Sequence, residues 1–123
     1  MHDATFPKWI VICSGGFAGL IGFAAMMVLH QRQLTEKAQL TQIDVGWVAT
    51  SCSNYFAYRG AWPTSLQEIA TEYGAPTHDA WGHNIGFVPF TPATGCGRVI
   101  SYGRDGNPGG KGPDADVEVR FGK

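Results

Sequence analysis

Residues 9–29 read WIVICSGGFAGLIGFAAMMVL, a stretch of 21 residues without a charged side chain. At ~1.5 Å per residue, a helix of this length would span roughly the ~30 Å hydrocarbon core of a bilayer. Lys8 precedes the stretch, Arg32 follows it, and Trp9 stands where an interfacial aromatic residue would lie. We therefore expect a membrane helix that is retained in the mature protein. The alternative is a cleaved secretory signal, whose apolar part is usually about 7–15 residues long.

The expected membrane helix carries small residues at helical spacing. Gly15 and Gly19 form a G-x-x-x-G pair, and Gly22 extends the same small-residue surface. Because such a surface lets a second helix approach closely in lipid, we expect it to pack against other membrane protein subunits. The alternative is that glycine is simply common in membrane helices.

The composition of the chain limits the class of protein to which it can belong. Its 123 residues provide for one small domain and no second core. Charged residues make up 15%, below the ~25% of ordinary soluble domains, which agrees with part of the chain lying in lipid. Nine basic residues stand against ten acidic ones, and this balance excludes a dedicated nucleic-acid-binding protein.

A helical pattern continues beyond the apolar stretch, and no proline or glycine pair interrupts it before Gly60. Apolar and amphipathic side chains recur at steps of three and four: Leu34, Ala38, Thr41, Val45, Val48, Cys52 and Tyr55. Leu40, Ile43 and Trp47 would widen this stripe. We expect one helix over about residues 8–57, whose second half packs on a small domain.

The rest of the chain predicts an α+β head. Residues 61–63 (Ala-Trp-Pro) end the long helix, and Thr64 or Ser65 caps a short helix that Gly74 ends. Three short segments rich in β-branched and aromatic residues predict strands over residues 84–88, 98–102 and 117–121. The expected fold class is therefore α+β, with a long N-terminal helix, a short helix and a three-stranded antiparallel sheet packed on the long helix.

Residues 101–117 read SYGRDGNPGGKGPDADV, a glycine-rich loop with three aspartates. Calcium takes six to eight oxygen ligands from carboxylates and backbone carbonyls, and Asp105, Asp114 and Asp116 would supply carboxylates. The spacing is not that of an EF-hand. The alternative is a solvated loop, because Asp-Gly and Asn-Pro-Gly are ordinary turn signals.

This loop resembles the C-terminal loop of the major pseudopilins of type II secretion systems, where S-x-G-x-D-G-x-x-G-G-x-x-x-D-A-D-I is typical. Residues 79–84 (DAWGHN) resemble the D-P-W-G-N-P stretch of that family, and residues 58–64 (YRGAWPT) resemble its tyrosine-proline-threonine step. The order of elements agrees as well, so the resemblance covers about residues 30–120.

The resemblance implies a structural Ca²⁺ in the loop. The side-chain ligands would be Asp105, Asp114 and Asp116, and the backbone carbonyls near Tyr102 and Gly112 would complete the shell. A loop with so few ligands binds calcium weakly, which is useful only where calcium is plentiful. This expectation places the head in the periplasm of a bacterium and the N-terminus in the cytoplasm.

The N-terminal sequence departs from the prepilin pattern of a basic leader, a glycine at the cleavage point and a glutamate at the fifth mature position. Gly16-Phe17 is the only comparable pair, and Ile21 would then stand fifth. No acidic residue lies between Asp3 and Glu36. We therefore expect no processing by a prepilin peptidase.

Three cysteines remain to be placed. Cys13 lies in the expected membrane helix and would pack as a small apolar residue. Since the long helix and the sheet pack together, Cys52 and Cys96 could form a disulfide in an oxidising space. The alternative is two unpaired buried thiols. No C-x-x-C motif points to thiol redox chemistry or a zinc site.

The expected organisation has four parts: a cytoplasmic tail (1–8), a transmembrane helix (9–29), its amphipathic continuation (30–58) and a periplasmic pseudopilin-like head (59–123). No nucleophile motif accompanies the histidines, so we expect no enzyme. The expected function is that of a structural component of a type II secretion or pilus-like apparatus, as a homo-oligomer or filament or with partner subunits. The alternative is an accessory subunit of another inner-membrane complex that reuses this head.

Overall fold

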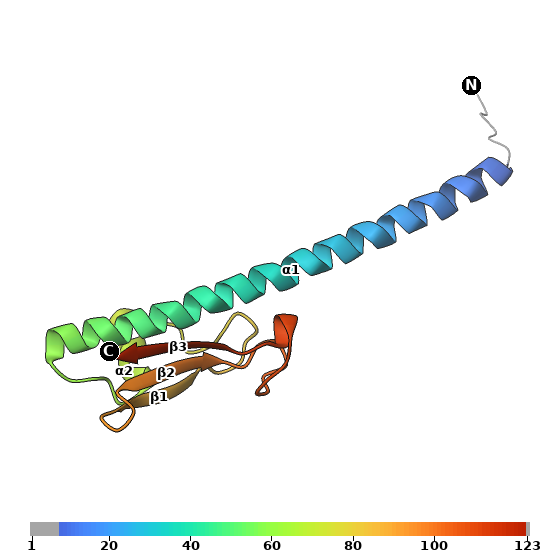
Figure 1. The fold of residues 1–123 in the computed structure, drawn as a ribbon. Coiled ribbons are helices and arrows are strands. Elements are labelled where there is room, and N and C mark those ends of the chain that lie inside the picture. The colour runs from blue at the N-terminus through green and yellow to red at the C-terminus, as the bar shows by residue number, and fades with distance from the viewer. Residues whose placement is uncertain (1–7, 123) are drawn as a thin grey trace. The chain divides into compact units, whose positions relative to one another are not determined.

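A computed structural model of the chain describes the backbone of residues 8–122 and the side chains of residues 19–122. Figure 1 shows the order of elements: α1 (Lys8–Arg59), α2 (Leu66–Tyr73), β1 (Gly86–Thr91), β2 (Cys96–Ser101), the 3-10 helix η1 (Gly112–Asp114) and β3 (Val117–Gly122). The three strands form one antiparallel sheet in the order β1-β2-β3. The predicted α+β fold is therefore confirmed; the 3-10 helix was not predicted.

The chain divides into two compact units, Met1–Leu34 and Thr35–Lys123, and α1 contributes to both. In the first unit, large apolar side chains of α1 are exposed: Leu20, Ile21, Phe23, Met26, Met27, Val28 and Leu29. Over residues 19–122, whose side chains are described, no helix is both long enough and apolar enough to cross a membrane. The first ten residues of the expected span 9–29, including Gly15, have side chains outside this range, so the membrane helix stays a prediction.

The second unit has its core between α1, α2 and the sheet. Val45, Val48 and Cys52 of α1 are completely buried, together with Ile69 of α2 and Val99 of β2. Their spacing along α1 is that of one helix face, as the sequence predicted. Aromatic rings extend this core, because the Trp62 ring lies against the rings of Phe56, Phe90 and Phe121.

The prediction that Leu40, Ile43 and Trp47 widen the buried stripe was wrong, since their exposed fractions are 51%, 63% and 49%. At ~100° per residue these three positions lie on the side of α1 opposite to Val45 and Val48. They form a second apolar stripe, which faces away from the sheet within the second unit.

The first four residues of β2 alternate between the two faces of the sheet, as the pleat of β-strands requires. Gly97 and Val99 of β2 lie on the core side and are buried, whereas Cys96 and Arg98 lie on the outer side. Gly97 is required here, because a Cβ atom at this position would lie 2.2 Å from the ring of its cross-strand partner Phe121.

The short helix α2 has the caps that the sequence predicted. The Ser65 hydroxyl accepts a hydrogen bond from the Glu68 backbone N–H at 3.3 Å, and the Thr64 hydroxyl donates to the Glu68 carboxylate at 2.8 Å. Gly74 ends the helix in the left-handed conformation, with φ of 65°. These contacts satisfy backbone groups at the two ends of α2 and fix where the helix begins and ends.

Candidate functional site

A buried carboxylate fixes the base of the glycine-rich loop between β2 and β3. Asp79 is 6% exposed, and its Oδ2 accepts a hydrogen bond of 2.6 Å from the Ser101 hydroxyl at the end of β2. Its Oδ1 accepts from the backbone N–H groups of Trp81 and His83 at 3.0 and 2.9 Å. The Ser101 oxygen in turn accepts from the Gly103 N–H at 3.2 Å. One carboxylate therefore joins the turn at residues 79–83 to the start of the loop.

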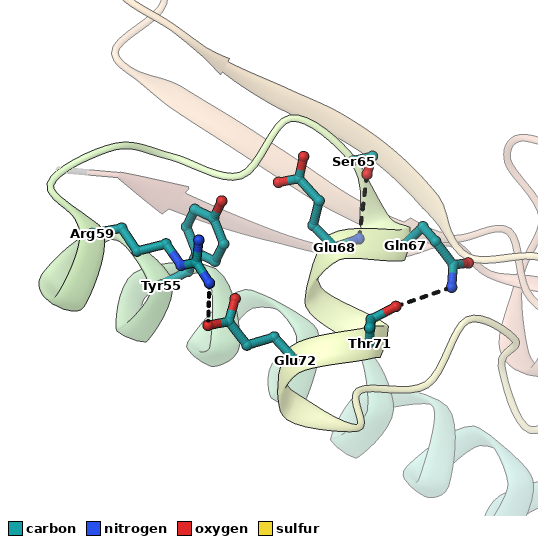
Figure 2. Close-up of a pocket in the computed structure, with 7 residues that line it drawn as sticks. All are labelled: Tyr55, Arg59, Ser65, Gln67, Glu68, Thr71 and Glu72. Carbon is teal, nitrogen blue, oxygen red and sulfur yellow. Dashed lines mark hydrogen bonds and ion pairs between the residues drawn. The ribbon is translucent and has the colours of Figure 1, made fainter.

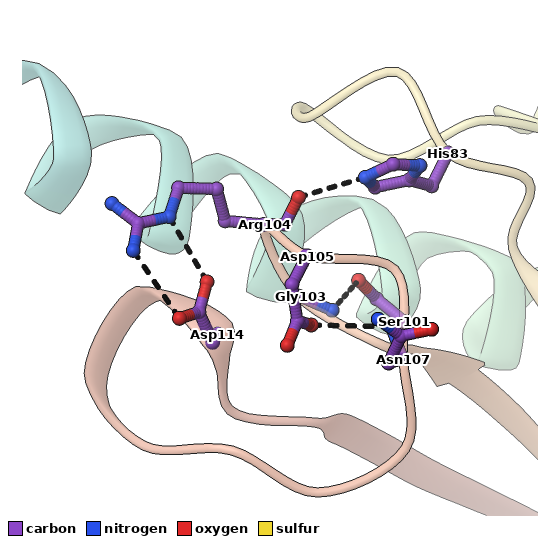
Figure 3. A network of polar contacts seen from close by, with 7 residues as sticks. All are labelled: His83, Ser101, Gly103, Arg104, Asp105, Asn107 and Asp114. Atoms are coloured by element: carbon purple, nitrogen blue, oxygen red, sulfur yellow. Dashed lines mark hydrogen bonds and ion pairs between the residues drawn. The ribbon is translucent and has the colours of Figure 1, made fainter.

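His83 supports the loop a few residues further on. Its Nε2 donates a hydrogen bond of 2.8 Å to the carbonyl oxygen of Arg104 (Figure 3). The imidazole ring also lies against Gly106, where a Cβ atom would be 3.0 Å from the ring. The same turn is tied to α1, because the Ala80 N–H donates to the Thr41 hydroxyl at 3.3 Å. Apart from its place in the DAWGHN stretch, no sequence pattern pointed to this role of His83.

Each of the three predicted aspartate ligands has a partner within the loop. Asp114 forms a bidentate ion pair with Arg104. The Nε and Nη2 atoms of Arg104 lie 2.9 and 3.2 Å from Oδ1 and Oδ2 of Asp114 (Figure 3). Asp105 accepts from the Asn107 N–H at 3.1 Å. Both carboxylate oxygens of Asp116 accept from one backbone N–H, that of Gly109, at 3.1 and 3.0 Å.

These placements allow the calcium prediction to be compared with the geometry. The loop does offer the oxygen ligands that calcium prefers. However, the three carboxylates bond to separate groups, and the carbonyl oxygen of Gly112 accepts from the Ala115 N–H in the 3-10 turn. Among the described residues, no three His, Cys, Asp or Glu side chains form a group that could hold a metal ion. In the observed conformation the three carboxylates therefore do not form one group of ligands, and the calcium site with the carbonyls near Tyr102 and Gly112 stays a prediction.

An open hollow of about 640 Å³ lies between the end of α1 and α2 (Figure 2). Its charged groups are paired: Arg59 contacts Glu72 at 2.7 Å and lies 4.9 Å from the centre of the Tyr55 ring. The hydrogen bond that Arg59 donates to Glu72, and then the negative charge of Glu72, raise the pKa of Arg59 above its ordinary value. The ion pair between Arg59 and Glu72 thus links the two helices across this hollow.

The outer face of the sheet carries a second shallow groove, lined by Val88, Thr91, Thr94, Cys96, Arg98 and Arg120. Arg98 and Arg120 are direct partners across β2 and β3, an arrangement of like charges that is unfavourable by itself. Glu118 contacts both, at 3.7 and 3.2 Å, and compensates part of this repulsion.

The predicted disulfide is not formed, since Cys52 and Cys96 are free thiols. Strand alternation provides the reason. Cys96 lies on the outer face of β2, in the groove just described, whereas Cys52 is completely buried in the core on the other side of the sheet. The sequence placed Cys96 next to the second predicted strand, but it did not determine on which face of the sheet its side chain would lie.

Comparison with known proteins gives one informative match. No protein-family model matches the chain. Over 100 residues the chain is 30% identical to the type II secretion system core protein G of Xanthomonas campestris pv. campestris, a match that covers 68% of this chain. The matched region covers 66% of that relative, slightly less than two thirds of its length. The predicted resemblance to the major pseudopilins is confirmed.

Proposed function

We propose that this chain, a relative of the type II secretion major pseudopilins, is a non-enzymatic structural component of a type II secretion or pilus-like apparatus. The observation that carries the proposal is the similarity to a type II secretion core protein G over 100 residues. The α+β fold with its long first helix agrees with the layout expected of that family. The partners would be copies of this chain or other subunits of the apparatus.

The exposed apolar residues of the first unit support a membrane location. Between residues 20 and 29, seven large apolar side chains are exposed and no residue is charged. Soluble monomers rarely expose apolar surface of that extent, so lipid or another helix would have to cover it. We place residues 9–29 in the bacterial inner membrane, residues 1–8 in the cytoplasm and the head in the periplasm.

The contacts of the charged side chains in the second unit also agree with a structural role. The ion pairs Arg59–Glu72 and Arg104–Asp114 each bridge two segments of the second unit. The buried Asp79 carboxylate is occupied by three hydrogen-bond donors. Groups engaged in this way hold the fold together and are not free for proton transfer.

A second candidate function is that of an accessory subunit in another inner-membrane complex. The observation that favours it lies in the first helix: Ile21 stands where a pilin processed at Gly16-Phe17 would carry its glutamate. No acidic side chain is available there between Asp3 and Glu36. Such a chain would keep the pseudopilin head without entering a filament.

Cross-linking in the membranes of the native host separates the two candidates. A photo-reactive residue would replace Ile43, which is 63% exposed on the outer stripe of α1, and a matched control would replace Arg120 on the outer sheet face. Adducts of the Ile43 variant with itself or with type II secretion subunits, and loss of protein export on deletion of the gene, support the first function. Adducts with another membrane complex, with export unchanged, support the second. Recovery of the chain outside the membrane fraction would contradict both.

A further inference from the structure

We propose that Arg104 is a built-in cation that closes the loop between β2 and β3, in the place where the family resemblance implies a calcium ion. The guanidinium engages both carboxylate oxygens of Asp114, ten residues further along the chain, at 2.9 and 3.2 Å. This bidentate geometry is typical of the strong, charge-assisted pairs that arginine forms with a carboxylate. The inference concerns the loop alone and does not depend on the proposed function.

The backbone of Arg104 strengthens the same closure. Its N–H donates to the Pro113 carbonyl at 2.9 Å, so a backbone bond and a side-chain pair join adjacent points of the two arms of the loop. Its carbonyl oxygen accepts a hydrogen bond of 2.8 Å from His83, and this bond connects the first arm of the loop to the turn at residues 79–83. The backbone of Arg104 is thus fixed by contacts of its own, so forming the ion pair costs rotamer entropy of the side chain but little further backbone entropy.

The loop is also packed closely around Asp114. A Cβ atom at Gly103 or at Gly110 would lie 2.6 Å from the Asp114 backbone, and both glycines have positive φ angles, 76° and 95°. Only glycine combines this conformation with such a close approach. The fold of the loop therefore brings Asp114 to the guanidinium, and the remaining two carboxylates bond to backbone N–H groups.

The consequence is a competition between two cations for one carboxylate. A divalent ion that used Asp114 would have to displace a positively charged group that already neutralises it. The Asp114 carboxylate also explains why the pKa of Arg104 is raised above its ordinary value, since it bonds to and attracts the guanidinium. We expect the wild-type loop to be closed without calcium, and to respond to calcium only when Arg104 is replaced.

The test compares Arg104→Gln with Arg120→Gln, which removes the same charge from the outer sheet face. The full chain in detergent is melted in excess chelator and in millimolar calcium chloride, and trypsin cleavage after Lys111 reports opening of the loop itself. The wild type should give the same melting temperature and cleavage rate in both solutions. Arg104→Gln in chelator should melt roughly 2–5 °C lower and be cleaved several-fold faster, as loss of a partly exposed ion pair implies. Calcium should restore both values.

Two results would overturn the proposal. One is a wild type whose melting temperature or resistance to trypsin rises clearly with calcium, since the loop would then need the ion despite Arg104. The other is an Arg104→Gln variant that behaves like Arg120→Gln in chelator. If Arg104→Gln does not fold, the response of the wild type to chelator and calcium still decides between the two cations. None of these readouts depends on secretion, so they remain distinct from a failure of the proposed function.

Discussion

Asp79 and Ser101 are separated by 22 positions in the chain and are joined by a buried hydrogen bond of 2.6 Å. The same carboxylate holds the backbone of Trp81 and His83, so it unites the turn after α2 with the end of β2. The loop that carries Arg104 starts directly after Ser101, the last residue of β2. The position of the loop therefore depends on a residue that lies outside it.

Replacement of Asp79 by alanine should lower the free energy of unfolding by about 2–4 kcal/mol, because three donors lose their acceptor in a buried place. Ser101→Ala removes one of these bonds and should cost about 1 kcal/mol. Urea unfolding of the full chain in detergent, followed by tryptophan fluorescence, measures both values. If Asp79→Ala lay within about 0.5 kcal/mol of the wild type, as ordinary surface substitutions do, the assigned role of this carboxylate would be wrong.

Two glycines should respond in opposite directions to replacement by alanine. Gly97→Ala places a Cβ atom 2.2 Å from the Phe121 ring in the core, and we expect a loss of about 1–3 kcal/mol or more in stability. Gly46→Ala meets no atom within 4 Å on α1, and we expect a gain of up to ~1 kcal/mol from helix propensity. Thermal melts of the two variants against the wild type provide the comparison. A neutral Gly97→Ala would mean that β3 shifts to accommodate the methyl group.

Much of the fold was predictable because its local signals agree with one another. The stripe Thr41, Val45, Val48 and Cys52 repeats at helical spacing, and all four side chains are buried. The capping residues of α2 occupy the predicted positions. By contrast, β1 runs to Thr91 and includes Pro89, although the prediction stopped at residue 88. Proline is compatible with β1 because this strand lies at the edge of the sheet, a fact that becomes visible only once the strand order is known.

The sequence predicted that a glycine-rich loop with three aspartates follows the second strand. It did not predict which group each aspartate would contact. Composition indicated that Asp105, Asp114 and Asp116 share one glycine-rich segment, and the resemblance assigned them to one ion. Which donor each carboxylate meets depends on glycines with positive φ and on contacts from His83, which sequence spacing does not encode. The face of Cys96 was missed for a related reason, since a shift of one residue in strand position reverses the side of the sheet.

Asp44 should make the stability of the protein depend on pH. Its pKa is raised above 3.8 by partial burial and then by the negative charge of Asp79. The folded state therefore penalises the charged carboxylate, and this penalty is present above the folded pKa and disappears as pH falls through it. Asp44→Asn should raise the melting temperature at pH 7, and the gain should shrink toward pH 3.8.

The control for that prediction is Glu36→Gln, which removes one negative charge from an exposed position of the same helix. Melting temperatures of both variants across pH 3.5 to 7 (roughly the titration range of carboxylates) separate a local effect from one of net charge. If Asp44→Asn and Glu36→Gln shifted the melting temperature alike at every pH, the interaction of Asp44 with Asp79 would have no measurable effect on stability.

The two described cysteines should differ strongly in reactivity. Burial raises the pKa of the Cys52 thiol to about 12, so the reactive thiolate is scarce at neutral pH, and its side chain is completely buried. Cys96 lines the groove on the outer sheet face and is partly exposed. In a Cys13→Ser background, iodoacetamide should therefore modify Cys96 in the folded protein, and should modify Cys52 only after denaturation. Peptide mass spectrometry before and after addition of urea locates the label. A native protein that takes up no label until a reductant is added would show a Cys52–Cys96 disulfide, and β2 would then have to present its opposite face to α1.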